Sequence, residues 1–276
     1  MYPLIKSMGV MQGRLLPKYN GRYQAHPLGY WHKEFDIAAR AGFEYIEFIL
    51  DHNDAELNPL MSAEGVKEII RQIGKTNVGV RSVCADYFME APLHHRDIDI
   101  ADSSLEVLKR LMHNSKEIGI RDIVIPCVDQ SSLMDEPAKQ RFVKRLRPLQ
   151  ELAEKLSINL SLETDLGPDA FGSLLSEFSS SRITVNYDTG NSASLGYDPI
   201  KEFESYGSRI SDIHIKDRKR KGGSVLLGTG DADFNAFFKA LANIYYDGPF
   251  IMQAFRDDEG LTITKQQFTW LQTNYY

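Results

Sequence analysis

Short apolar runs alternate with helix-like segments along the whole chain, and this alternation limits the possible folds more than any other feature. The apolar runs are rich in Ile, Val and Phe, which is typical of buried parallel strands. Strands are expected at Ser7–Met11, Glu44–Leu50, Val78–Ala85, Asp122–Val128, Ile158–Glu163, Ile183–Asp188, Ile210–Ile215 and Phe250–Ala254. Parallel strands need crossover connections, so each strand and the helix after it form one repeating unit.

The segments between these strands have helical periodicity and residues that start or stop helices. Ser62 and Glu64 suit a cap and a first turn, and Gly42 and Gly119 follow helix ends. Helices are expected at Tyr30–Ala41, Ser62–Lys75, Asp102–Ile118, Pro137–Leu156, Pro168–Phe178, Pro199–Tyr206, Asp233–Ile244 and Lys265–Leu271. Eight such units predict a (β/α)₈ TIM barrel. A doubly wound open sheet is the alternative, but no Gly-x-Gly-x-x-Gly turn follows the first strand.

Composition narrows the possible organisation and partners. No linker or low-complexity tract interrupts the 276 residues, so we expect one domain spanning residues 1–276. The net charge of −6 argues against binding to nucleic acid or to an anionic membrane. Two cysteines inside apolar runs, Cys84 and Cys127, suit buried thiols in a reducing compartment. We found neither the apolar core of a signal peptide nor a long apolar run, and therefore expect a cytoplasmic protein without a membrane span.

Polar side chains lie at the ends of the last four expected strands. In a barrel of this type the active site lies at the carboxyl ends of the strands. If the apolar faces meet the outer helices, strand alternation directs Glu163, Asp188, His214 and Gln253 toward the same end of the lumen. Each residue alone could be a satisfied polar residue of the core. Together they form an oxygen-rich donor set with one imidazole, which predicts a site for one divalent ion, Mn²⁺, Mg²⁺, Co²⁺ or Zn²⁺.

Further polar residues could line the same pocket. Arg14 follows the first strand and could hold an anionic group of a substrate, although a loop arginine often only faces solvent. Glu47 and Asp86 end the second and third strands and are expected to bind substrate. Lys216 shares the strand face of His214, and the basic run Arg218–Lys221 could contact a phosphate or be a solvated loop.

Several motifs at these positions resemble the sugar isomerase/epimerase superfamily, whose barrels are similar to that of xylose isomerase. The matching runs cover most of the chain and are GFEYIEF at 42–48, LETD around Glu163, NYDTGN around Asp188, DIHIKDR around His214, LGTGDADF at 227–234 and YDGPFIMQ at 246–253. The superfamily includes ketose 3-epimerases, ribulose-phosphate 3-epimerases and inosose dehydratases. The resemblance implies an enzyme acting on a small sugar or sugar phosphate, and possible assembly into a homo-oligomer.

The family pattern also implies roles for single residues. Its metal is held by Glu, Asp, His and Glu, of which Glu163, Asp188 and His214 match and Gln253 departs. Arg218 matches an arginine near the substrate oxygens. Asn191 stands where many members have His, and could hydrogen-bond a hydroxyl.

The departure at Gln253 bears on the reaction, because inverting a carbon through an enediolate needs proton transfer on two faces and Gln cannot act as a base at neutral pH. With Glu163 as the acid/base, we therefore expect an isomerase or a lyase (dehydratase) rather than a two-base epimerase, unless Glu47, Asp86 or a metal-bound water serves the second face. A sugar-binding barrel without turnover is an alternative. An abasic-site endonuclease would need more His and carboxylate ligands and a basic surface.

Overall fold

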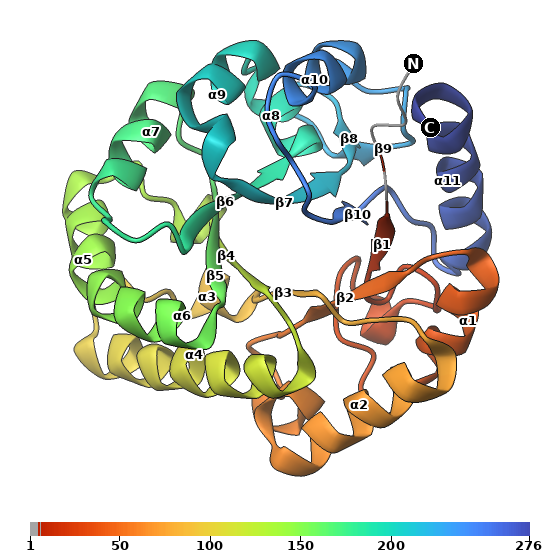
Figure 1. Ribbon diagram of the computed structural model, residues 1–276, viewed down its shortest axis with the longest axis horizontal. Helices are drawn as coiled ribbons and strands as arrows, with labels where there is room; N and C mark the ends of the chain where they lie inside the picture. The colour runs from red at the N-terminus through yellow and green to blue at the C-terminus, as the bar shows by residue number, and fades with distance from the viewer. Residues whose placement is uncertain (1–4, 6) are drawn as a thin grey trace.

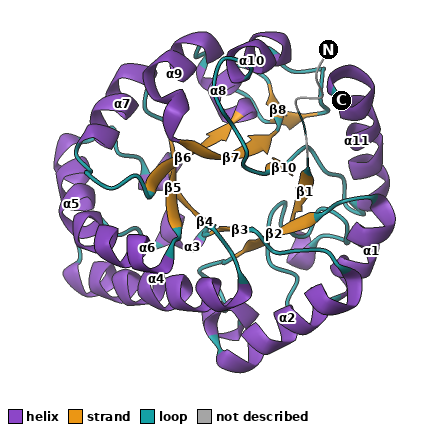
Figure 2. Ribbon diagram, viewed as in Figure 1, coloured by secondary structure: helices purple, strands orange, loops and turns teal. Residues whose placement is uncertain are grey.

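The computed structural model, which describes residues 5 and 7–276, is a closed ring of eight parallel strands surrounded by helices (Figures 1 and 2). Around the ring the strands follow the order β1, β10, β7, β6, β5, β4, β3, β2, so the first and last barrel strands are neighbours and close the sheet. The barrel strands are β1 Met8–Met11, β2 Tyr45–Ile49, β3 Ser82–Cys84, β4 Asp122–Cys127, β5 Asn159–Thr164, β6 Ile183–Asp188, β7 Ile210–Ile215 and β10 Phe250–Met252. The predicted (β/α)₈ barrel is confirmed.

The helices form the outer layer, and most of them follow a strand in the expected way (Figure 2). They are α1 Lys33–Ala41, α2 Ala63–Thr76, α3 Tyr87–Glu90, α4 Ile98–Ile118, α5 Glu136–Leu146, α6 Gln150–Leu156, α7 Pro168–Ser176, α8 Thr189–Leu195, α9 Pro199–Tyr206, α10 Phe234–Leu241 and α11 Leu261–Tyr275. None of the helices in the described part of the chain has the length and apolar character that a membrane span requires.

Strand alternation divides the interior into two regions with different chemistry. Apolar side chains such as Ile213 and Met252 point outward and join the large core between the sheet and the helices. The alternate positions point into the lumen, where a small apolar cluster of Met11, Ile49, Cys84, Val124 and Ile251 lies among polar side chains. The predicted register, with apolar faces toward the helices, is therefore confirmed, and polar lumen residues reach the carboxyl end of the barrel.

Besides the short helices α3 and α8, which were not expected, two local features differ from the expected elements. The segment expected as one helix at Pro137–Leu156 is divided into α5 and α6, because Pro148 between them lacks the N–H that a continuous helix requires. The basic loop after β7 forms a small antiparallel hairpin, β8 Asp217–Arg218 paired with β9 Ser224–Val225. This hairpin brings Arg218 to the barrel mouth.

Candidate metal and substrate site

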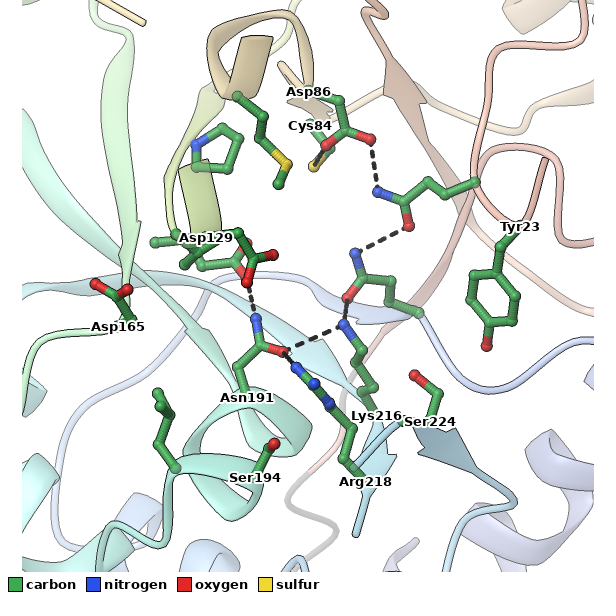
Figure 3. A pocket seen from close by; sticks show the side chains of 18 residues that line it. Tyr23, Cys84, Asp86, Asp129, Asp165, Asn191, Ser194, Lys216, Arg218 and Ser224 are labelled. Atoms are coloured by element: carbon green, nitrogen blue, oxygen red, sulfur yellow. Dashed lines mark hydrogen bonds between the residues drawn. The ribbon is translucent and has the colours of Figure 1, made fainter. Parts of the chain in front are cut away.

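A pocket of about 370 Å³ opens at the carboxyl ends of the strands, where TIM-barrel active sites lie (Figure 3). The predicted residues that line it are Glu163, Gln253, Lys216, Arg218, Asn191 and Asp86. These residues follow five different barrel strands in the chain. The pocket therefore gathers side chains that are up to 167 positions apart in the sequence only because the sheet closes.

Glu163, Asp188 and His214 form a compact buried group, and of the three Glu163 lines this pocket. One ligand atom from each residue lies within 4.8 Å of the other two, and all three side chains are buried. Nδ1 of His214 is 3.8 Å from Oε2 of Glu163. Neighbouring parallel strands β5, β6 and β7 supply the three residues, and their common register explains the convergence. This group of three could hold a metal ion.

His214 is oriented by hydrogen bonds on both ring nitrogens. Nε2 donates to Oε1 of Glu47 at 2.8 Å, and Nδ1 accepts from the amide nitrogen of Asn186 at 3.0 Å. The proton therefore lies on Nε2, and the lone pair lies on Nδ1, the ring nitrogen near Glu163. A metal-binding histidine commonly has this arrangement, with a carboxylate accepting from the nitrogen that does not bind the metal. The donor set thus fits a divalent cation.

Glu47 and Asp212 form a second acidic group with His214, deeper in the lumen. Burial raises the pKa of both carboxyls, to about 7 for Glu47 and well above the ordinary range for Asp212. Because Nε2 of His214 carries the proton on this side, the deeper group supports the imidazole rather than presenting a lone pair to a cation. Ser82 donates a further hydrogen bond of 2.5 Å to Glu47.

Glu163 is held by two asparagine amides. Asn186 donates to Oε2 at 3.1 Å, and Asn191 donates to Oε1. Burial raises the pKa of the Glu163 carboxyl, and the negative charge of Asp188 adds to the rise. A fixed carboxyl with a raised pKa suits the removal and return of a proton near neutral pH.

Asp188 both ends β6 and begins α8. Its Oδ1 accepts from the backbone N–H groups of Gly190 and Asn191 at 2.8 Å each, so the carboxylate caps this helix. Its Oδ2 remains directed toward the pocket, where Lys216 contacts it at 3.2 Å. The short helix α8 is absent from the sequence-based expectation, although Asp followed by Thr-Gly-Asn was a usable capping signal.

Lys216 lies at the centre of the polar pocket wall. Its Nζ donates to Oδ2 of Asp188 and Oε1 of Gln253, each at 3.2 Å. It also donates to Oδ1 of Asn191 at 3.4 Å (Figure 3). Gln253 is therefore connected to Asp188 through the ammonium group of Lys216. The carbonyl oxygen of Gln253 is directed at the same place as Asp188, which would suit a fourth oxygen ligand.

The hairpin that carries Arg218 is fixed by Asp217. The Asp217 carboxylate accepts from the backbone N–H groups of Gly228, Gly230 and Ala232 at 3.0, 2.8 and 3.1 Å. A Cβ at Gly230 would collide with this carboxylate, so only glycine fits there. Arg218 then donates to Oδ1 of Asn191 at 2.8 Å. The glycine-rich turn thus positions the arginine at the pocket.

Behind Asp188 and α8, a buried carboxylate holds three hydroxyl groups together. Glu202 accepts from Ser192 at 2.5 Å, Tyr206 at 2.8 Å and Tyr187 at 2.9 Å. These residues belong to α9, α8 and β6, so the network ties the helix carrying Asn191 to the barrel wall. The sequence reasoning did not identify this support.

Two residues expected to bind substrate do not reach the pocket. Arg14 is 1% exposed, and its guanidinium donates to the carbonyls of Ala254 and Tyr23 and to Gln24. It therefore holds the loops beside β1 together instead of meeting an anion. Glu47 is completely buried beneath His214 and acts on the site only through that imidazole.

Sequence reasoning also missed Gln24. Its amide donates to Asp86 at 2.7 Å, while its oxygen accepts from Gln253 at 3.2 Å and from Arg14 at 3.0 Å. Gln24 thus connects Asp86 to Gln253 and Arg14 through hydrogen bonds. It lies in a loop without periodicity, so no sequence pattern marked it.

Comparison with known proteins supports the assignment of fold and family. A putative L-ribulose-5-phosphate 3-epimerase, SgbU, of Escherichia coli K12 is 27% identical over 239 residues, which cover 81% of this chain and 83% of the relative. Among solved structures, D-allulose 3-epimerase from Methylomonas sp. in complex with D-allulose superposes with a TM-score of 0.75 at 20% identity, covering 98% of this chain and 97% of the other. The IolI protein with a bound zinc atom gives a TM-score of 0.74 at 15% identity, covering 98% and 99%.

The family model for the xylose isomerase-like TIM barrel matches residues 35–274. The predicted resemblance is confirmed, and so, at the level of the family, is the expected enzyme class of sugar isomerases and epimerases. The chain belongs to the xylose isomerase-like TIM barrel family.

Proposed function

We propose that this protein is a divalent-metal-dependent epimerase or isomerase of a sugar or sugar phosphate, acting through an enediolate. The observation that carries the proposal is the group of Glu163, Asp188 and His214, whose ligand atoms lie within 4.8 Å of one another, with the proton of His214 on Nε2 and its lone pair on Nδ1. The relatives support the substrate class, since SgbU is named for a ketose phosphate and the Methylomonas enzyme for a ketose.

Glu163, Asp188 and His214 would hold the metal ion, and Gln253 would offer its amide oxygen as a fourth ligand. The zinc atom bound by IolI, which has the same fold, supports metal binding. When bound, a divalent ion would polarise the substrate carbonyl and stabilise the negative charge of the enediolate.

Glu163 is the residue placed to move the proton. Asn186 and Asn191 fix both of its oxygens, so the carboxylate keeps one orientation toward the pocket. It would remove the proton from the carbon beside the carbonyl and return it to the enediolate. Arg218, Asn191 and Lys216 lie on the same wall and would orient the substrate oxygens by donating hydrogen bonds.

A one-base reaction is a second candidate, favoured by the amide at Gln253. Aldose–ketose isomerisation can move a proton between neighbouring carbons on one face, and dehydration also needs one base. Glu47 cannot transfer a proton on the second face of the substrate, because its side chain is buried beneath His214. The relatives are named as epimerases, which favours inversion of a carbon atom of the substrate.

Metal analysis followed by reaction in D₂O tests the proposal. The purified protein should bind about one divalent ion, and Ala at Glu163, Asp188 or His214 should lower the bound metal while the barrel remains folded. The loaded protein is then incubated with ketoses, aldoses and their phosphates. Epimerisation gives an inverted carbon carrying deuterium, isomerisation gives the aldose or ketose partner, and dehydration removes one water. Full metal occupancy in all three variants, or binding without any conversion, would reject the proposed enzyme.

A further inference from the structure

The pocket wall contains more acidic than basic side chains. Three aspartates line it in addition to Glu163, and they come from the loops after β3, β4 and β5 (Figure 3). They are Asp86, Asp129 and Asp165. Among the described residues that line the pocket, the cationic side chains are Lys216 and Arg218. The proposed metal chemistry uses Glu163 and Asp188 and leaves these three aspartates without a role.

Asp86 is fixed in place but retains free accepting capacity. Its Oδ2 accepts from Gln24 at 2.7 Å, and its Oδ1 accepts from the thiol of Cys84 at 3.1 Å. A carboxylate has about four lone-pair sites, so roughly two remain for another donor. Asp86 lines the pocket, and Gln24 lies between it and Gln253. Asp86 can therefore meet a hydroxyl group of a substrate bound there.

The two cations of the pocket already have acceptors. Lys216 forms an ion pair with Asp188 at 3.2 Å, and Arg218 donates to the carbonyl of Gly222 and to Asn191. The rest of the basic run does not belong to the pocket wall. Lys219 lies 3.9 Å from Asp231, and Arg220 packs against Gly196. Little positive charge is thus left to neutralise a phosphate.

We infer that Asp86 is a specificity-determining residue which accepts hydrogen bonds from substrate hydroxyl groups, and that the acidic wall selects an unphosphorylated sugar over its phosphate. This inference rests on the proposed function and decides between its two substrate classes. It concerns recognition and not the reaction, so it holds for epimerisation, isomerisation or dehydration alike.

The physical basis is the difference between the two ligands. Hydroxyl groups of a sugar donate to carboxylates without adding charge. A phosphate carries about −1.5 to −2 charges at pH 7, and it accepts hydrogen bonds as the carboxylates do. Next to Asp86, Asp129 and Asp165 it would meet like charges in a partly buried pocket, where repulsion is stronger than in bulk water. A site discriminates through such unpaired or repelled groups as much as through favourable contacts.

Binding measurements with a matched pair of ligands test the inference. Ribulose and ribulose 5-phosphate, each as D and L enantiomers, are titrated calorimetrically into the Mn²⁺-loaded protein, and conversion is followed in parallel. We expect at least one enantiomer of ribulose to bind roughly tenfold or more tightly than its phosphate. Asp86→Asn should weaken ribulose binding about tenfold and reduce this preference. Asp165→Asn and Asp129→Asn should strengthen phosphate binding, whereas the exposed Asp36→Asn serves as the control and should change neither.

Tighter binding of ribulose 5-phosphate by the wild type would overturn the inference, as would an unchanged preference in Asp86→Asn, or no binding of either ligand. If Asp86→Asn does not fold, the wild-type preference and the variants at Asp129 and Asp165 decide the question. Binding of ribulose without any conversion would reject the proposed enzymatic function while leaving the recognition by Asp86 supported. The two failures are therefore distinguishable.

Discussion

Oε1 of Glu47 lies 2.8 Å from Nε2 of His214, and both side chains are completely inaccessible to solvent. This pair joins β2 and β7 across the lumen, although 167 positions separate the two residues in the chain. Glu47 fixes the proton on Nε2, and the lone pair therefore lies on Nδ1, the ring nitrogen near Glu163.

Glu47→Gln should weaken metal binding without altering the pocket wall. The amide keeps the shape but removes the negative charge that makes the imidazole a stronger ligand, so we expect a 10- to 100-fold rise in the metal Kd. Isothermal titration with Mn²⁺ measures the effect. Ser82→Ala, which removes the hydroxyl group that donates to Oε2 of Glu47, is the matched control and should raise the metal Kd less. An unchanged Kd in Glu47→Gln would show that the imidazole does not bind the metal.

Lys216→Met should strengthen metal binding. The ammonium is 3.2 Å from both Asp188 and Gln253, so it competes with a cation for their oxygens and repels it. Methionine fills a similar volume without charge. We expect the Mn²⁺ Kd to fall by roughly tenfold, which corresponds to about 1.4 kcal/mol. Lys219→Met, which removes a half-exposed lysine beside Asp231, should leave the Kd unchanged. Weaker binding in Lys216→Met would contradict this competition.

Gln253→Glu should restore a second carboxylate beside the metal. The new charge would pair with Lys216 and with the cation, so we expect tighter Mn²⁺ binding and faster inversion of a ketose. Gln253→Met removes the amide oxygen and should have the opposite effect on affinity. Deuterium incorporation at the inverted carbon reports on the reaction. If both variants bind Mn²⁺ and invert substrate as the wild type does, Gln253 has no part in the site.

Glu163 and Arg14 show which side-chain positions the sequence patterns predict and which they do not. Glu163, Asp188 and His214 lie on strands whose alternation is visible in the sequence, and their convergence follows from a parallel register. Arg14 lies in a loop, where the same residue type could face solvent, bind an anion or be buried. Its burial depends on how Gln24 and Ala254 pack around it, and these contacts span up to 240 positions.

The hydrogen bond between Glu47 and His214 could not be predicted for a related reason. Its position on the lumen face of β2 was predictable, but its partner is decided by the size of the closed ring and by the order of strands across it. The division of charge in the pocket likewise arises from loops after five strands that meet only in the folded barrel. Local sequence patterns therefore predict the strands, the helices around them and the polar face of the strands. The contacts between side chains of different strands depend on the geometry of the closed barrel.

The last prediction concerns acid stability and His26. Burial lowers the pKa of this imidazole to about 3, and Nδ1 donates to Gln12 at 2.8 Å. In the unfolded chain the histidine protonates near pH 6.5, whereas in the folded protein it stays neutral down to about pH 3. Its contribution to stability is therefore fully present above pH 6.5 and is lost as the pH falls toward 3, by an amount on the order of 4 kcal/mol.

His26→Asn tests this prediction, because it preserves a donor to Gln12 but cannot titrate. The variant should be less stable than the wild type at pH 7.5, and this difference should shrink steadily as the pH is lowered to 4. Urea unfolding at a series of pH values measures it, with the exposed His32→Asn as the control. If the two unfolding free energies ran parallel over this range, the imidazole of His26 would not be buried as a neutral group.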